Sequence, residues 1–486
     1  MKYLLGIDFG GGASKATLLS EKGEISAEST VEYPTYYPQS GWAEQNPGDW
    51  YEATCKNILS VIEKSGINSC DILAVSLDAA THTAVLTDES FSVLRPAIYW
   101  TDTRSIQQVN RLKAEEFILK QALHKPDTIW TLPQLMWVRE NEPEIWSKTR
   151  KIFFAKDYVR HLLTGDYVTD YIEAQGSMLF DYNKMKWSDE LCEIIGSNPM
   201  MLPETVNPKD ITGKITKKAA EETGLCEGTP VLCGTTDTAM EVFASGSVSP
   251  GNMTVKLATA GRICVVTERA YPNQHLINYS HVIDGLWYPG TATKSCAASY
   301  RWYRDTFGES FAELDNGAEK IKPGSDGLIF HPYLNGELTP YADPMLCGSF
   351  IGIRAGHTKA HFTRAVLEGV AMSLLDCKNT LEEIGIPHDD TAVIIGGGAK
   401  SPLWRQIVAD VLGITLVQKR CSDSSFGSAM LAGIASGIFT DFKTAVSTCN
   451  KTVSETVPDM KNYEKYKLIF KKYKQVHDVL APIYHQ

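Results

Sequence analysis

Apolar and alternating runs in the first part of the chain predict strands, one helix and a tight turn. Residues 3–8 and 15–20 are β-prone and flank three glycines at 10–12, which is the composition of a hairpin. Apolar residues recur at helical spacing over 50–64. The expected elements are strands at 3–8, 15–20, 25–32, 71–78 and 84–87 and a helix at 50–64. Hairpins followed by helix–strand alternation indicate an α/β layer architecture.

A similar opening occurs halfway along the chain. Residues 253–258 and 262–267 are β-prone and flank the small-residue turn 259–261, after a loop-like stretch at 246–252. Two halves that each begin with a strand, a small turn and a strand suggest a duplicated fold with a cleft between the copies. The predicted domains are residues 1–245 and 246–486.

The end of the chain predicts one more strand and three helices. A strand at 392–395 runs into the turn Gly396–Ala399, and helices are expected over 403–412 and 426–436. In the segment 463–480, aromatic and apolar residues keep i,i+3/i+4 spacing among lysines. This spacing predicts an amphipathic closing helix whose lysines face solvent.

Composition and charge narrow the class of function. The 486 residues include 47 Lys and Arg against 58 Asp and Glu, a formal net charge of −11. This balance argues against nucleic-acid and anionic-membrane partners, although it leaves phosphate ligands open. The 11 cysteines are scattered without a C-x-x-C pair, so we expect reduced thiols in a cytoplasmic protein. We expect no export signal and no membrane span, because Asp8 interrupts the apolar start and no apolar run approaches ~20 residues.

The segment from Asp8 to Lys15 can carry phosphate chemistry. A carboxylate at a strand end places a Mg²⁺ ligand beside the backbone amides of Gly10, Gly11 and Gly12, and Lys15 can add a positive charge. The alternative reading is a plain hairpin whose turn needs glycine for positive φ. The segment is not a Walker A loop, because no glycine directly precedes the lysine.

Other polar positions follow predicted strands. Asp237 lies at a strand-to-helix junction, where it can take the proton of an attacking hydroxyl or simply cap the helix. The turn Gly396–Ala399 admits a flat ring or a ribose but lacks the G-x-G-x-x-G pattern, which disfavours a dinucleotide fold. Trp100 with Asp102 suits sugar recognition, and an Asp–Arg surface pair is the alternative. His82 can touch a ligand hydroxyl or be a structural histidine.

In order along the chain, several segments resemble the FGGY carbohydrate kinase family, and the resemblance spans essentially the whole sequence. The stretch that closes on Ala365-Val366-Leu367-Glu368 fits the family's second signature at every defined position. The turn Gly396–Ala399 is most similar to xylulokinase-like members. The segments are Asp8-Phe9-Gly10 with Lys15, residues 40–47, Lys156-Asp157-Tyr158 with Leu163-Thr164-Gly165, residues 332–337 with Thr339-Pro340, Gly348-x-Phe350-x-Gly352-Ile353, His361-Phe362, and Ala365-Val366-Leu367-Glu368.

The resemblance implies two actin-like (ribonuclease H-like) α/β domains flanking a deep ATP and sugar cleft, with sugar and phosphate-hairpin functions in the first and nucleotide binding in the second. It implies ATP-dependent phosphorylation of a xylulose-like ketose, with another ketose, a sugar acid or a polyol as alternatives, and Mg²⁺ as cofactor. A homodimer is compatible with the family. By position it implies Asp237 as general base, Asp8 as the carboxylate near Mg²⁺, Gly10, Gly11, Gly12, Lys15, Thr259 and Gly261 at the phosphates, Gly397, Gly398 and Ala399 at the adenosine, and Thr81, His82, Trp100, Asp102 and Thr238 at the sugar.

The chain departs from the family in its ligand-facing turns. Gly11 and Gly12 stand where Thr or Ser is usual, Ala260 replaces a Ser, and Thr238 stands where xylulokinases have Asn. Backbone amides remain for phosphate, so we expect kinase activity, whereas the sugar-side changes bear on which sugar is accepted. Two rival hypotheses stay open: a sugar or nucleotide sensor without turnover, and an actin-like ATPase that acts on a protein partner.

Overall fold

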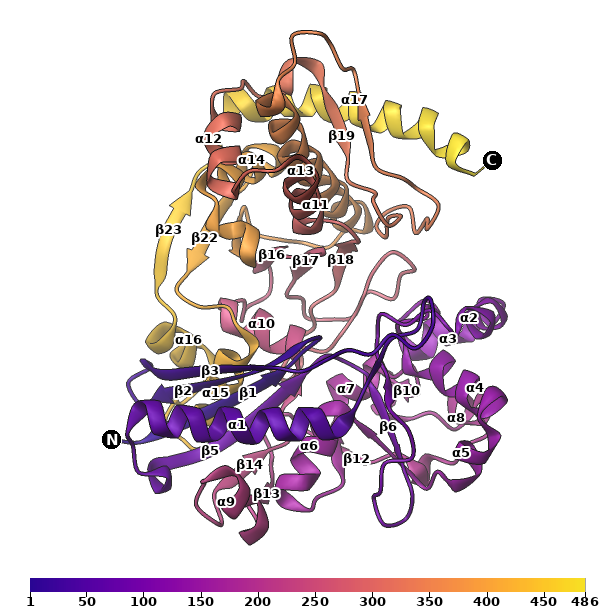
Figure 1. Ribbon diagram of the computed structural model, residues 1–486, viewed down its shortest axis with the longest axis vertical. Coiled ribbons are helices and arrows are strands. Elements are labelled where there is room, and N and C mark those ends of the chain that lie inside the picture. The colour runs from indigo at the N-terminus through magenta and orange to yellow at the C-terminus, as the bar shows by residue number, and fades with distance from the viewer. Residues whose placement is uncertain (486) are drawn as a thin grey trace.

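The computed structural model describes residues 1–485. Two α/β bodies, each built on a central sheet, lie one above the other in Figure 1, and α10 (Asp237–Ser245) lies between them. Each body has its own cluster of buried apolar side chains around its sheet. No helix of the described residues combines the length and the apolar character that crossing a membrane requires.

The first sheet has seven strands. Its order is β13-β14-β5-β1-β2-β3, and the short β15 also pairs with β5. β1 pairs antiparallel with β2 and parallel with β5. The strands are β1 (Tyr3–Phe9), β2 (Ala13–Ser20), β3 (Ile25–Glu32), β5 (Ile72–Ala79), β13 (Ile211–Lys214), β14 (Pro230–Leu232) and β15 (Thr235–Thr236).

The second sheet has six strands in the order β18-β17-β16-β21-β22-β23. β16 pairs antiparallel with β17 and parallel with β21, which repeats the arrangement around β1. The strands are β16 (Met253–Leu257), β17 (Gly261–Val265), β18 (Gly290–Thr293), β21 (Thr391–Ile395), β22 (Thr415–Lys419) and β23 (Thr452–Thr456). The repeated topology confirms that each half opens with the same strand–turn–strand unit.

Helices cover both faces of the first sheet. α1 (Pro47–Ser65) lies along β2 and β3, and it begins where the Asn46 side chain accepts a hydrogen bond from the Gly48 amide. The opposite face is covered by α15 (Ser424–Ala435), which comes from the far end of the chain and packs on β1 and β5. A Cβ on Gly6 of β1 would lie 1.9 Å from the Ser425 carbonyl oxygen, so this close approach requires glycine.

The return of α15 and α16 (Phe442–Cys449) to the first body means that the chain crosses between the bodies more than once (Figure 1). The predicted boundary between residues 245 and 246 describes the first crossing and stays a prediction. α10 packs against α15, where a Cβ on Gly427 would lie 2.5 Å from the Met240 carbonyl oxygen.

The remaining elements form the upper body and an insertion beside the first sheet. In the upper body, α13 packs against β17 and β18, and α17 packs on α14. The helices there are α11 (Ala297–Phe307), α12 (Phe311–Glu319), α13 (Lys359–Ile384), α14 (Pro402–Leu412) and α17 (Met460–Tyr484), with strands β19 (Ile329–His331) and β20 (Ser349–Ile351). The insertion holds β4 (Glu44–Gln45), β6 (Ala84–Thr87), β7 (Ala97–Ile98), α2 (Ile106–Leu112), α3 (Glu116–Ala122), α4 (Thr131–Asn141), α5 (Pro143–Lys148), β8 (Lys151–Phe154), β9 (Val168–Asp170), α7 (Tyr171–Gly176), β10 (Phe180–Asp181), β11 (Lys186–Trp187), α8 (Asp189–Ile194) and β12 (Glu204–Val206). Two further helices, α6 (Ala155–Thr164) and α9 (Lys217–Thr223), pack with α1 and share the core of the first sheet.

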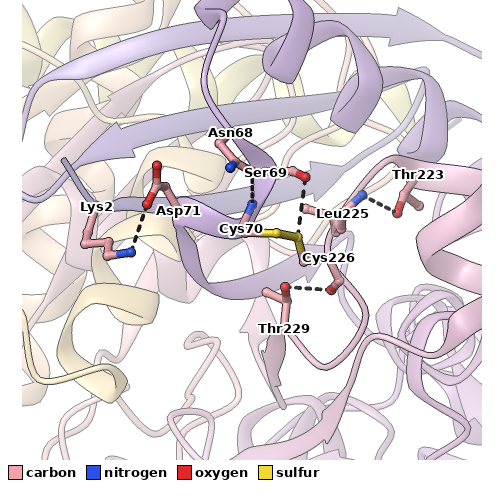
Figure 2. Close-up of a disulfide and its surroundings, with 9 residues drawn as sticks. All are labelled: Lys2, Asn68, Ser69, Cys70, Asp71, Thr223, Leu225, Cys226 and Thr229. Atoms are coloured by element: carbon pink, nitrogen blue, oxygen red, sulfur yellow. Dashed lines mark hydrogen bonds and ion pairs between the residues drawn. A yellow bond between two sulfur atoms is a disulfide. The ribbon is translucent and has the colours of Figure 1, made fainter.

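The expectation of reduced thiols is wrong for one pair of cysteines. Cys70 and Cys226 form a disulfide with their Cα atoms 5.2 Å apart, as Figure 2 shows. They are 156 residues apart in sequence, but Cys70 precedes β5 and Cys226 precedes β14, and these two strands are neighbours in the sheet. Spacing along the chain could not reveal this pair, because only the parallel pairing of the strands brings the sulfurs together.

Candidate active site

The turn between β1 and β2 leaves its backbone open. Gly10, Gly11 and Gly12 are not among the positive-φ residues, so the alternative of a turn that needs glycine for its conformation does not explain them. A Cβ on Gly11 would lie 2.6 Å from the Tyr99 hydroxyl, whereas one on Gly10 or Gly12 would meet nothing within 4 Å. The Tyr33 hydroxyl donates a hydrogen bond to the Gly10 carbonyl. Glycine therefore keeps this surface free of side chains, which suits close approach by a phosphate.

Two carboxyl groups lie side by side at the ends of β1 and β5, where Asp8 and Asp78 are in register. Burial and the charge of Asp237 raise the pKa of Asp8 to about 7, although hydrogen bonds with Asp78 and Ser424 lower it. Burial and the charge of Asp8 raise the pKa of Asp78, whose Oδ2 accepts a hydrogen bond from Ser428. The pair therefore carries less than its full negative charge near pH 7.

Asp237 is the first residue of α10, and it is not the N-cap residue. That role belongs to Thr236, whose side chain accepts a hydrogen bond from the Ala239 amide. Asp237 Oδ1 accepts hydrogen bonds from the first-turn amide of Thr238 at 2.6 Å and from the Thr81 hydroxyl at 3.5 Å. We refer to Asp8, Asp78 and Asp237 as the acidic group.

The turn that carries Thr81 and His82 is held by α7 and α4. His82 has a φ of 55°, and its amide donates to the Glu173 carboxylate while its carbonyl accepts from the Thr131 hydroxyl. A Cβ on Gly176 would lie 2.8 Å from Thr81 Cγ2 and 2.9 Å from His82 Cδ2, so glycine makes room for the turn. Burial lowers the pKa of His82 to about 3, which keeps its imidazole neutral at physiological pH.

Lys15 lies opposite Asp8 in the β1–β2 ladder but contacts other carboxylates. Its ammonium group forms ion pairs with Glu28 at 2.8 Å and with Asp423, which immediately precedes α15. Burial lowers the pKa of Lys15 and the hydrogen bonds to Asp423 and Glu28 raise it, with a net upward shift. A phosphate contact for Lys15 stays a prediction. It would require the lysine to leave its ion pairs with Glu28 and Asp423 and to bind the phosphate instead.

Asp102 forms a buried pair with Arg104 rather than the surface pair considered from the sequence. The carboxylate lies within 3.0 Å of the Arg104 Nε and Nη2 atoms and also accepts the Ala43 amide at 2.6 Å. The pair thus ties the Ala43 segment to the strand end that bears Trp100, whose side chain is 41% exposed. Sugar contacts for Asp102 and Trp100 stay predictions.

The two small-residue turns of the upper body contact each other. Gly396 has a φ of 92°, and a Cβ there would lie 2.6 Å from the Leu257 carbonyl oxygen at the end of β16. A Cβ on Gly398 would lie 3.0 Å from Leu257 Cβ. A Cβ on Gly397 would meet nothing within 4 Å, and Ala399 is buried. In the neighbouring turn, the Thr259 carbonyl accepts a hydrogen bond from the Cys296 amide. A Cβ on Gly261 would lie 2.9 Å from Thr293 Oγ1. The predicted phosphate and adenosine turns are therefore adjacent.

The sequence interpretation missed four charged residues near Asp237. Asp78 belongs to the acidic group, and its signal was a carboxylate at the end of a buried strand. Lys256 and Arg262 face each other across β16 and β17, and their signal was two cations flanking a small turn in a β-prone run. We refer to Lys256 and Arg262 as the basic pair. Glu241, one turn after Asp237 on α10, forms an ion pair with Lys256.

The acidic group offers oxygen ligands that suit Mg²⁺ together with a nucleotide. Asp8 Oδ1 and Asp78 Oδ1 are buried without a hydrogen-bond partner, and Mg²⁺ prefers oxygen ligands and is commonly bound by one or two carboxylates plus phosphates. No group of three or more His, Cys, Asp and Glu within residues 1–485 is arranged to hold a metal ion. The residues therefore fit a metal that arrives with phosphate oxygens and water.

Comparison with known proteins places this geometry in a family. The N-terminal domain of the FGGY family of carbohydrate kinases matches residues 3–244, and its C-terminal domain matches residues 233–436. The chain belongs to the FGGY family of carbohydrate kinases. It is an enzyme of the xylulokinase-like type, and its two-domain α/β fold confirms the predicted fold class.

Individual FGGY relatives cover nearly the whole chain. A xylulose kinase of Bacillus subtilis (strain 168) is 34% identical, covering 98% of this chain and 97% of the relative. A gluconokinase of the same strain is 28% identical over 93% and 91% of the two chains. The crystal structure of xylulose kinase from Rhodospirillum rubrum superposes with a TM-score of 0.92 at 26% identity and covers 100% of both chains.

Proposed function

We propose that this FGGY kinase transfers the terminal phosphoryl group of ATP to a hydroxyl of a small sugar, with Asp237 as the general base. The observation that carries this proposal is the position of Asp237, which follows the N-cap residue Thr236 and lies beside Thr81 and the pair Asp8 and Asp78. A carboxylate so placed can orient the acceptor hydroxyl and take its proton late in the transfer.

Phosphoryl transfer depends mainly on the alignment of the reactants and the neutralisation of charge. Other residues of the site would supply these two effects. The open backbone at Gly10–Gly12 and the turn at Thr259 would receive phosphate oxygens, and the turn at Gly397–Ala399 would receive the adenosine. Asp8 and Asp78 would hold Mg²⁺, which when bound neutralises the phosphate charge. The neutral imidazole of His82 and the hydroxyls of Thr81 and Thr238 would contact the sugar.

The acceptor in this proposal is a small ketose, sugar acid or polyol. A xylulose-type ketose comes first in the test panel because the relative with 34% identity is named a xylulose kinase, and a sugar acid is included because another relative is named a gluconokinase. Thr238 stands where xylulokinases have Asn on the sugar side, so the panel must cover more than one acceptor class.

A coupled assay of ADP release across ketoses, sugar acids and polyols tests the proposal. We expect Mg²⁺-dependent phosphorylation of at least one acceptor, and retained nucleotide binding with lost turnover in Asp237→Ala. If no acceptor in the panel is phosphorylated, the proposed function is wrong for this chain. If Asp237→Ala keeps its turnover, the kinase stands and the assignment of the base is wrong.

A further inference from the structure

The basic pair puts two like charges opposite each other in one hairpin. Lys256 on β16 and Arg262 on β17 are directly paired in the antiparallel ladder, so their side chains leave the same face of the sheet. Like charges at such positions destabilise a sheet unless other groups neutralise them. Only one of the two cations is neutralised within residues 1–485, because Lys256 pairs with Glu241 and Arg262 forms no salt bridge.

The guanidinium of Arg262 is left with two unused donors on one edge. Its Nε and Nη2 atoms are buried and have no hydrogen-bond partner among the described residues. These two N–H groups form the fork that matches the two oxygens of a carboxylate or phosphate. Arg262 as a whole is half-buried, but buried donors of a charged group that lack a partner are costly to the fold. These two donors of Arg262 are therefore suited to bind an anion.

The surroundings hold the Arg262 side chain in place without satisfying it. The guanidinium carbon lies 6.0 Å from the ring centre of Tyr279 and 5.7 Å from that of Tyr288. A Cβ on Gly290 would lie 3.3 Å from Arg262 Nε, so the glycine of β18 leaves space for the side chain. Aromatic faces attract a cation but do not take the place of oxygen acceptors.

A continuous set of rings connects this guanidinium to the turn at His82. His124 lies 5.2 Å from Tyr279 and stacks on Trp130 at 4.1 Å, and Trp130 lies 4.8 Å from His82. Both ring nitrogens of His124 are buried without a partner, as is Nδ1 of His82. Unpartnered polar atoms are rare in folded proteins, and here they lie along one series of packed rings that includes the neighbours of Arg262.

The basic pair is tied to the helix that carries the proposed base. Arg262 is the cross-strand neighbour of Lys256, and Lys256 forms an ion pair with Glu241 at 2.5 Å. Glu241 lies one turn after Asp237 on α10, so the guanidinium and the carboxylate of Asp237 belong to one neighbourhood. An acceptor whose hydroxyl reaches Asp237 can present its other end to the guanidinium.

We propose that Arg262 binds an anionic group of the acceptor, so that this kinase prefers a sugar acid, held through its carboxylate, to a neutral ketose or polyol. The inference rests on the proposed function, because it names the substrate class of the same site. A terminal phosphate of the nucleotide is the other oxyanion that could reach the same fork. The series of packed rings that leads from Arg262 to His82 favours the acceptor, and the experiment separates the two.

The test compares matched acceptors that differ in the carboxylate, namely D-gluconate with D-glucitol and D-xylonate with xylitol, together with D-xylulose. For the wild type we expect kcat/KM to be higher for each acid than for its neutral partner. In Arg262→Met the ratio of acid to neutral kcat/KM should fall about 100-fold, because a charge-assisted double hydrogen bond is lost. In Arg262→Lys it should fall about tenfold, since the charge stays and the fork is lost. Arg269→Met, at an exposed arginine over Tyr271, is the control and should leave the ratio unchanged.

Each contrary result has one meaning. If the wild type phosphorylates neutral acceptors as well as acids, the inference is wrong and the proposed function stands; if it phosphorylates none, the proposed function fails first. If Arg262→Met raises the KM for ATP and lowers turnover equally with every acceptor, the fork binds nucleotide phosphate and the inference is overturned. Binding gives a readout without turnover or variants, because D-gluconate but not D-glucitol should raise the melting temperature of the wild type without nucleotide. An equal shift with both contradicts the proposal.

Discussion

The hairpins β1–β2 and β16–β17 occupy equivalent places in the two sheets, yet they bring opposite charges to the site. In the first, Asp8 is paired across the ladder with Lys15, and the lysine is neutralised by Glu28 and Asp423. In the second, Lys256 is paired with Arg262. The same strand–turn–strand unit therefore supplies Asp8 of the acidic group from one body and the basic pair from the other.

In this contrast, one half of a duplicated fold contributes carboxylates to the site and the other half contributes cations. Carboxylates suit a metal and a proton acceptor, whereas cations suit the anions that the reaction brings together. α10 joins the two charge types, because Asp237 and Glu241 lie one turn apart on the same helix and Glu241 pairs with Lys256. Changes to either hairpin should therefore have different signatures, which the following predictions use.

The largest effect is expected from removing the base of the acidic group. Asp237→Asn should lower kcat about 1000-fold, because the acceptor hydroxyl loses its proton acceptor, and should leave nucleotide binding intact. Steady-state kinetics and calorimetric titration with ADP measure the two properties. Asp305→Asn, at an exposed carboxylate paired with Arg304, is the control. A loss in kcat of less than tenfold would contradict the assigned role.

The next effect concerns the free energy of unfolding, to which a disulfide contributes in the first sheet. The disulfide Cys70–Cys226 ties β5 to β14 in the first sheet, so Cys70→Ser should lower the free energy of unfolding by about 2–4 kcal/mol under oxidising conditions. Urea unfolding with and without a reductant measures it, and reductant should bring the wild type to the level of the variant. Cys347→Ser, at an exposed free cysteine, is the control. A wild type indifferent to reductant would show that the bond contributes nothing.

A smaller effect is expected where α7 supports the sugar-side turn. In Gly176→Ala the new methyl group would press on Thr81 and His82, so the KM for the acceptor should rise about 10-fold to 100-fold with little change in the KM for ATP. Gly356→Ala, where a Cβ meets nothing within 4 Å, is the matched control. Equal changes in both KM values would indicate a general disturbance of the fold instead.

The smallest effect, taken per pH unit, is a pH dependence of stability that belongs to the acidic group. The pKa of Asp8 is about 7 in the folded chain against an ordinary value of 3.8, so between pH 4 and 7 the folded state holds a proton that the unfolded state releases. The free energy of unfolding should therefore fall as pH rises through this window, with a contribution of at most about 1.4 kcal/mol per pH unit. In Asp8→Asn this contribution should vanish. Urea unfolding from pH 5 to 8 without nucleotide measures both slopes, and identical slopes would contradict the assignment.

Much of the local structure could be predicted from the sequence because it depends on neighbours along the chain. The strand over 392–395, the glycine turn after it and the helix over 403–412 occur as β21, the turn at Gly396 and α14. Helix α15 begins at Ser424, two residues before the predicted start, with Asp423 at its N-cap position, although the Asp423 side chain makes no capping hydrogen bond. The alternative of Asp237 as a cap could be decided only by seeing that Thr236 takes that role.

The sequence by itself determined the family, the repeated strand–turn–strand units and the residues Asp8 and Asp237, because these are carried by local patterns of residue type. The tertiary structure decided what depends on contacts between distant segments. It placed α15 on the first sheet, joined Cys70 to Cys226, buried Asp102 against Arg104 and left Nε and Nη2 of Arg262 without a hydrogen-bond partner. The physical reason is that burial and pairing of a charge are properties of its surroundings in space, which no spacing along a chain records.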